Sequence, residues 1–79
     1  MTRFRVLLAG GDRTHQEQYA RHFRDDPRCL LVGVTDLPAA PPARMAANAA
    51  LAARFGIPLL RFEEALRLPC DIVSVCVAL

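Results

Sequence analysis

The chain has 79 residues, a hydrophobic content of 53% and a formal net charge of +2. A chain this short forms one domain at most and buries only about 60% of the surface that its unfolded form exposes, so we expect marginal stability in isolation. Its ten basic residues are all Arg and are scattered among eight acids, which argues against a nucleic-acid-binding surface. No apolar run is long enough to span a bilayer, and the residues after Met1 lack a secretory signal pattern, so we expect a cytoplasmic protein.

The first predicted element is a buried strand over residues 4–9, which runs into the tight turn of Gly10–Gly11. Thr14 and Glu17 then have the spacing of a capping box, which predicts a helix beginning at Thr14. The Asp-Pro pair at residues 26–27 should end this helix. Its apolar stripe is formed by Tyr19, Ala20 and Phe23.

A second strand is predicted over residues 29–35, with Asp36 at its end. Residues 37–42 contain three prolines and form a loop. The alanine-rich stretch 43–55 predicts a second helix, which Gly56 and the proline after it should stop.

The remaining elements are a short third strand over residues 58–61, a one- or two-turn helix over 62–68 and a fourth strand over 71–79. Strands that alternate with helices predict an α/β fold with a parallel sheet, because parallel neighbours cannot be joined by tight hairpins. We therefore expect a partial Rossmann-type, doubly wound sheet of four strands in the order 3-2-1-4, with two longer helices and one short helix.

The last predicted strand is apolar throughout and needs cover on both faces. In open parallel sheets ligands bind beyond the carboxyl ends of the strands, where the strand order reverses. The loop after Leu79 should therefore form part of the site. We expect residues 1–79 to be an incomplete N-terminal dinucleotide-binding domain without its C-terminal substrate domain, its last strand covered by an oligomer contact or a partner chain.

The three cysteines, Cys29, Cys70 and Cys76, lie within or beside predicted strands and lack the paired spacings of zinc or redox motifs. They are best explained as small buried hydrophobic residues in a reducing compartment. This also favours the cytoplasm.

Several segments follow one another in an order typical of a known family. They are Val6–Gly11, His15, Leu31–Asp36, Ala52–Pro58 and Asp71–Val75. Through them the chain resembles the N-terminal region of the Gfo/Idh/MocA family of NAD(P)-dependent oxidoreductases. The most distinctive part is Ala53–Pro58 followed by Glu63–Leu66 and the strand Asp71–Val73. The resemblance implies a nicotinamide dinucleotide as cofactor. It also implies hydride transfer on a small hydroxy, sugar-like or imino substrate in a full-length parent.

The turn after the first strand is the expected phosphate end of that site. A dinucleotide needs a glycine turn that lets backbone amides approach the pyrophosphate, and a helix N-terminus that faces it. The candidate residues are Ala9, Gly10, Gly11, Asp12, Arg13 and His15. The turn lacks the G-x-G-x-x-G spacing, and Asp12 and Glu17 repel phosphate, although Arg13 offsets part of that charge. The alternative is that the glycine pair serves only to connect strand and helix.

Asp36 is the expected ribose end, because a carboxylate at the end of the second strand accepts hydrogen bonds from ribose hydroxyls. Its charge repels a 2′-phosphate and Leu37-Pro38 supplies no cation, so the sequence favours NAD over NADP, with Arg44 the main reservation. The alternative is that Asp36 caps a loop.

His15 and His22 lie on nearly the same helical face, but no carboxylate or cysteine accompanies them at ligand spacing, so we expect no metal site. In the resembled family the catalytic lysine follows the next strand, and this chain has no lysine. We therefore expect no catalytic residue here and no activity from the chain alone, since hydride transfer needs an enclosed site.

Two other functions fit the same alternation of elements. A degenerate receiver-like signalling domain needs several acids at the strand ends, and here the first strand supplies only Asp12, with Cys76 where a phosphoacceptor is expected. A small non-catalytic interaction module would instead pair its last strand with another chain, because an uncovered apolar edge invites strand addition.

Overall fold

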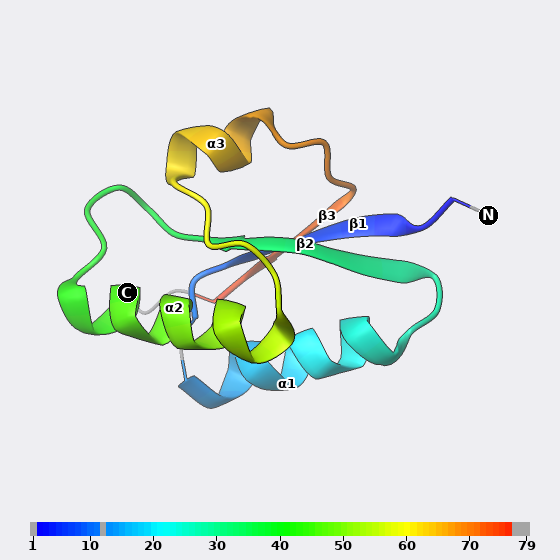
Figure 1. Cartoon of the computed structure of the whole chain (residues 1–79), viewed down its shortest axis with the longest axis horizontal. Helices are drawn as coiled ribbons and strands as arrows, with labels where there is room; N and C mark the ends of the chain where they lie inside the picture. Colours follow the sequence, from blue (N-terminus) through cyan, green and yellow to red (C-terminus); the bar gives the residue numbers. More distant parts are fainter. Residues whose placement is uncertain (1, 12, 77–79) are drawn as a thin grey trace.

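The protein is described here by a computed structural model that covers residues 2–11 and 13–76 (Figure 1). It is built of short strands that alternate with helices. In chain order the elements are β1 (Phe4–Ala9), α1 (Arg13–Asp25), β2 (Cys29–Thr35), α2 (Pro42–Phe55), α3 (Phe62–Arg67) and β3 (Ile72–Val75).

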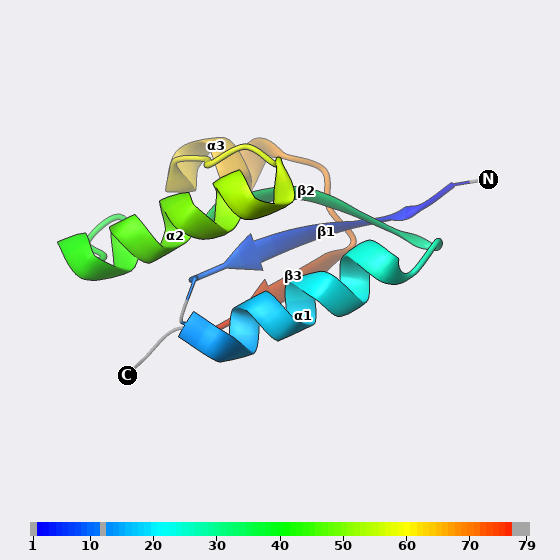
Figure 2. The ribbon, with the colours of Figure 1, turned by 60° about the horizontal axis from the view of Figure 1, so that its bottom comes forward.

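The described strands form one parallel sheet in the order β2-β1-β3, so β1 is central. Helices α1 and α2 cover one face of this sheet, and the short α3 lies toward the other (Figures 1 and 2). The N-terminal ends of α1 and α2 lie at the same edge of the sheet as the carboxyl ends of the strands (Figure 2). Ala9, Gly10, Gly11 and Asp36, four of the predicted site residues, lie at this carboxyl edge.

The prediction of four strands in the order 3-2-1-4 is wrong. Residues 58–61 form a single bridge, Leu59 to Val34, instead of a strand. The Val34 amide donates to the Pro58 carbonyl over 2.9 Å, and the Leu60 amide donates to the Val34 carbonyl over 2.8 Å. Pro58 has no amide hydrogen to continue the ladder, and α3 begins directly after this segment, so the pairing stops at one residue.

The core lies between the sheet and the two long helices. Its buried residues are Val6, Leu8, Ala20, Cys29, Val34, Leu51 and Ala52. A register shift after Val6 leaves Leu8 opposite Val34, so that both side chains remain in this core. Gly56 ends α2 with a left-handed φ of 63°, which confirms the predicted helix stop.

The capping box predicted for the first helix is wrong. Helix α1 begins at Arg13, so Thr14 lies inside the helix. The Glu17 carboxylate instead accepts from Arg54 of α2 over 2.7 Å and from Arg21 over 3.4 Å. Glu17 therefore connects the two long helices.

Strand β3 is shorter and more exposed than predicted. Only residues 72–75 are in the strand, and residues 77–79 of the predicted strand lie outside the described residues. Val73 is 49% and Val75 is 63% exposed, while Ile72 packs against the core. The described strand is therefore covered on the α1 side but not on both faces.

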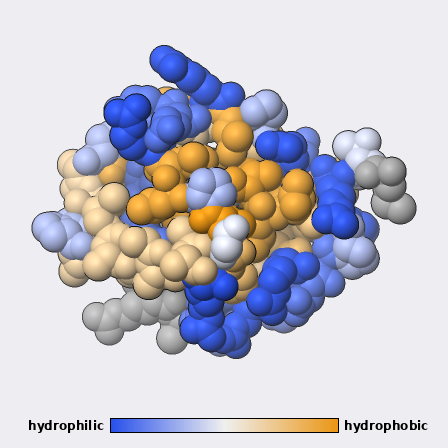
Figure 3. All heavy atoms as spheres, viewed as in Figure 1, coloured by the Kyte–Doolittle hydropathy of each residue, from blue (hydrophilic) through white to orange (hydrophobic). Residues whose placement is uncertain are grey.

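Apolar side chains also reach the surface elsewhere. Figure 3 shows a hydrophobic area over β2 and the segment between α2 and α3. Leu30 and Leu59 are among the exposed large hydrophobic residues. No helix within the described ranges is long and apolar enough to cross a membrane.

Candidate functional site

The turn after β1 is held in place by the neighbouring strand. Gly10 has a φ of 87°, a conformation that side-chain-bearing residues rarely adopt. Its amide donates to the Thr35 carbonyl at the end of β2 over 2.8 Å. Glycine at position 10 is therefore required by the backbone, and the turn has a fixed place at the carboxyl edge.

The second glycine of the turn lies against α2. The Gly11 amide donates to Oδ1 of Asn48, and a Cβ added to Gly11 would lie 2.6 Å from that oxygen and 3.0 Å from the Asn48 Cα. Glycine at this position thus allows the helix to approach the turn. The amide that was predicted to face a phosphate is bound to Asn48 instead.

Asp36 follows β2 and is almost completely buried, with its side chain 1% exposed. The Arg44 guanidinium donates two hydrogen bonds to its carboxylate, from Nε to Oδ2 over 2.7 Å and from Nη2 to Oδ1 over 2.8 Å. Asn48 Nδ2 donates to Oδ2 over 2.9 Å, and the Leu37 amide donates to Oδ1 over 2.7 Å. These four donors match the number that one carboxylate accepts, roughly two for each oxygen.

Two opposing effects act on the pKa of Asp36. Burial, the largest single effect, raises this pKa, but the hydrogen bonds from Arg44, Asn48 and the Leu37 amide together with the charge of Arg44 outweigh it, so the net shift is below the ordinary value. The carboxylate is therefore ionised at neutral pH, and it forms a charge-neutral pair with Arg44. We call the chain of contacts Arg44, Asp36, Asn48 and Gly11 the Asp36 network.

A second polar cluster joins the ends of β1 and β3. Gln16 of α1 is fully buried, and its Nε2 donates to the carbonyls of Gly10 and Ser74, each over 2.8 Å. Its Oε1 accepts from the Ser74 hydroxyl over 2.9 Å. We call Gln16 with Ser74 and the Gly10 carbonyl the Gln16 clasp. It fixes the glycine turn relative to the last described strand.

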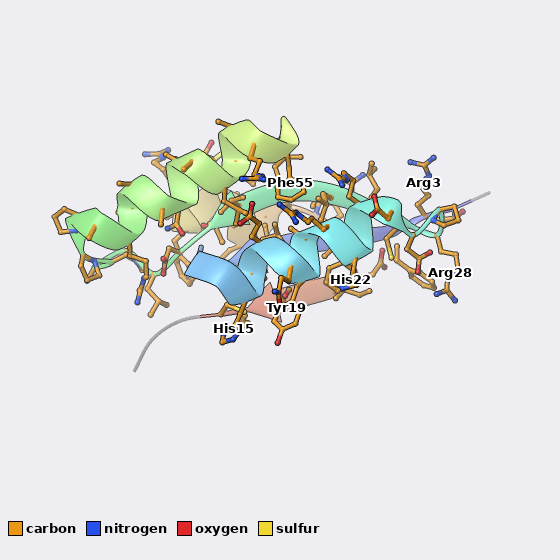
Figure 4. All side chains as sticks on the ribbon, turned by 90° about the horizontal axis from the view of Figure 1, so that it is seen from below. Arg3, His15, Tyr19, His22, Arg28 and Phe55 are labelled. Carbon is orange, nitrogen blue, oxygen red and sulfur yellow. The ribbon has the colours of Figure 1, made fainter. Side chains whose placement is uncertain are left out.

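The structure brings four predicted site residues, Ala9, Gly10, Gly11 and Asp36, together at the carboxyl edge. The Ala9 carbonyl accepts from the Cys76 amide over 2.8 Å. His15 is exposed and lies with Tyr19 and His22 along the side of α1 that faces away from α2 (Figure 4). Asp12 and the Arg13 side chain lie outside the described residues.

Neither Gln16 nor Asn48 was recognised in the sequence, although both are fully buried. A signal for each was present. Asn48 is a polar residue in an otherwise alanine-rich stretch. Gln16 lies four positions before Ala20, so Gln16 and Ala20 share one face of the first helix, and Ala20 was predicted to be buried.

Two hollows adjoin this region. One, of about 500 Å³, lies between α1 and α2 and is lined by Gly11, Ala47, Ala50 and the Glu17–Arg54 ion pair. The other, of about 200 Å³, lies at the end of β2, where Asp36, Leu37, Pro38, Arg61 and Glu63 are among its lining residues. Among residues 2–11 and 13–76 there is no group of His, Cys, Asp or Glu side chains placed to hold a metal ion.

Comparisons with protein-family models, with curated proteins and with solved structures gave no match for this chain. The resemblance to the Gfo/Idh/MocA family therefore stays a prediction.

Proposed function

We propose that the chain is a nucleotide-binding α/β unit that uses the carboxyl edge of its sheet. More specifically, we propose the NAD(P)-binding portion of a cytoplasmic oxidoreductase that acts by hydride transfer on a small hydroxy, sugar-like or imino substrate. The observation that carries the proposal is the turn at Gly10, which has a positive φ and connects the central strand β1 to the N-terminus of α1.

The physical basis is the field at that helix end. The unpaired amides at the N-terminus of a helix carry a partial positive charge, which favours a phosphate group. Helix α1 has 13 residues and no acidic side chain in its first turn. Glu17, which was expected to repel phosphate, is paired with Arg54 and Arg21. These contacts support a pyrophosphate at the turn.

The ribose end fits less well in the arrangement described. Asp36 has no acceptor capacity left, and the Gly11 amide is bound to Asn48. We therefore assign the pyrophosphate contact to the Gly10 turn and α1, and no ribose contact to Asp36. A bound nicotinamide would supply the hydride acceptor or donor, and the chain's own contribution is to bind and orient the cofactor.

The proposal is tested by recording amide resonances of the isotope-labelled 79-residue chain during titration with ADP. Gly10 and Gly11 should shift in a saturable way, and Gly56, at the far end of α2, should not. Saturable shifts at Gly56 alone, or no saturable shift with ADP, NADH or NADPH, contradict the proposal.

A charge-insertion pair sharpens this test. His15→Glu adds a negative charge in the first turn of α1, where it favours the helix but repels a phosphate. His22→Glu places the same charge near the other end of the helix. Only His15→Glu should weaken ADP binding, by about tenfold, which corresponds to about 1.4 kcal/mol. Equal weakening by both variants indicates a general charge effect and argues against the site.

A second candidate, a non-catalytic interaction module, is favoured by one observation. Val73 and Val75 are exposed on β3, at the edge of the sheet. Such an edge can be extended by a strand from another chain. If sedimentation shows a stable dimer that Val75→Lys dissociates, this candidate gains support, whereas a monomer at high micromolar concentration counts against self-pairing.

A further inference from the structure

The end of β2 offers an incoming ligand guanidinium N–H donors and not a free carboxylate. Each oxygen of Asp36 already accepts two hydrogen bonds, and the side chain is 1% exposed. Ribose hydroxyls need an acceptor with unused capacity. Asp36 can serve them only if Arg44 or Asn48 first moves away.

Arg44 is the better-exposed member of the pair. Its side chain is 16% exposed, compared with 1% for Asp36. Among the described residues its guanidinium hydrogen bonds only to Asp36, through Nε and Nη2, although a guanidinium has further N–H donors. Planar guanidinium donors match the geometry of phosphate oxygens. An anionic group at this position would therefore find further N–H donors with a geometry that suits its oxygens.

The surrounding charges do not cancel this preference. Asp36 and Arg44 neutralise one another, so Asp36 does not act as a lone negative charge on the ligand, and Arg44 contributes N–H donors and no net charge. Arg61 and Glu63 line the hollow of about 200 Å³ beside Asp36, and their opposite charges offset one another. Arg44 does not line this hollow, but its further N–H donors lie beside Asp36 and select the group accepted at the end of β2.

We infer that Arg44 is a specificity-determining residue for adenosine nucleotides that carry a 2′-phosphate, so that the site takes NADP in preference to NAD. This inference rests on the proposed function, because it concerns the ribose end of the same site. It reverses the preference for NAD expected from the sequence, which assumed that the Asp36 carboxylate faces the ribose. Here that carboxylate orients the Arg44 guanidinium.

The test compares two ligands that differ only in the 2′-phosphate, adenosine 2′,5′-bisphosphate and adenosine 5′-monophosphate. Isothermal titration of the 79-residue chain should give at least about tenfold tighter binding of the bisphosphate. Equal binding, or tighter binding of the monophosphate, overturns the inference and leaves the proposed function intact. Binding of neither ligand removes the proposed function, and the inference with it.

Two variants locate the effect. Arg44→Gln should abolish the preference, whereas Arg54→Gln, also on α2 but paired with Glu17, should keep it. Because Arg44→Gln leaves Asp36 buried without its counter-charge and can unfold the chain, Asp36→Asn provides an independent measurement. It releases the guanidinium without removing it, so the preference for the bisphosphate should increase about threefold or more. A preference reduced by Asp36→Asn, or lost equally in Arg54→Gln, contradicts the role of Arg44.

Discussion

The Gln16 clasp should make a large contribution to stability, and a neighbouring glutamine provides the control. Gln16→Ala removes three short hydrogen bonds, to the carbonyls of Gly10 and Ser74 and from the Ser74 hydroxyl. At a net contribution of about 1 kcal/mol for each bond, the loss is about 3 kcal/mol. The total stability of a domain of this size is only about 4–12 kcal/mol. A loss of about 3 kcal/mol therefore lowers Tm by roughly 12–24 °C.

The matched variant is Gln18→Ala, because Gln18 lies on the same helix but is exposed. Both changes bring the same small gain in helix propensity, so this gain cancels in the comparison. The chain has no Trp and one Tyr, so urea unfolding is best followed by far-ultraviolet circular dichroism. Gln18→Ala should change the free energy of unfolding by no more than about 0.5 kcal/mol. If Gln16→Ala has an effect of the same size, the clasp does not stabilise the fold.

Three further changes test other parts of the structure. Gly11→Ala should lower the free energy of unfolding by about 1–3 kcal/mol in the same urea assay, because the added Cβ would lie 2.6 Å from Asn48 Oδ1. An unchanged urea midpoint refutes the close approach of α2 to the turn. Gly56→Ala should lower the free energy of unfolding by about 1 kcal/mol, because its φ of +63° is unfavourable for alanine even though no atom lies within 4 Å of the new Cβ. A thermal melt with an unchanged Tm argues against the left-handed cap. Acid should also destabilise the chain. The folded-state pKa of Asp36 is lowered, so its contribution to the free energy of unfolding is complete above the unfolded pKa of about 3.9 and is lost as pH falls through the folded pKa. Asp36→Asn should therefore flatten the low-pH part of a plot of stability against pH. If that part is unaltered, Asp36 is not the group that causes the loss of stability in acid. The pKa of Asp26 is also lowered, to about 2, by hydrogen bonds from Arg28, but the Asp26 side chain is 26% exposed and Arg28 is 73% exposed, so solvent screens this pair. Asp26→Asn is therefore the control and should change that part of the plot less than Asp36→Asn.

The local elements that the sequence predicted well are those with strong short-range signals. The strand over residues 4–9 and the stop of the second helix at Gly56 both depend on neighbouring residues, and both are confirmed. The prediction of a third strand was wrong because residues 58–61 form only one bridge, between Leu59 and Val34. An apolar run in the sequence does not show how far such backbone pairing extends. Tyr19 was assigned to the buried stripe of the first helix but is 47% exposed, and Gln16 takes the buried position.

The site was predicted in its location but not in its bonding. The sequence placed the glycine turn and Asp36 together because parallel strands end at one edge. It could not show that Asn48, 12 residues after Asp36, would bridge that carboxylate to the Gly11 amide. Such contacts depend on the distance between a helix and a turn, and this distance is set by the packing of the whole domain.

The central position of β1 has a consequence for the order in which the chain is made. One side of β1 pairs with β2, but its other side pairs with β3, whose residues 72–75 are synthesised more than 60 residues later. On the ribosome, β1 and Gln16 therefore remain without these partners until Ser74 has emerged. Contacts of such long sequence separation are entropically costly to close, so they form late and slow folding. During translation, the nascent β1–α1–β2 unit is the stage most open to a chaperone or to aggregation.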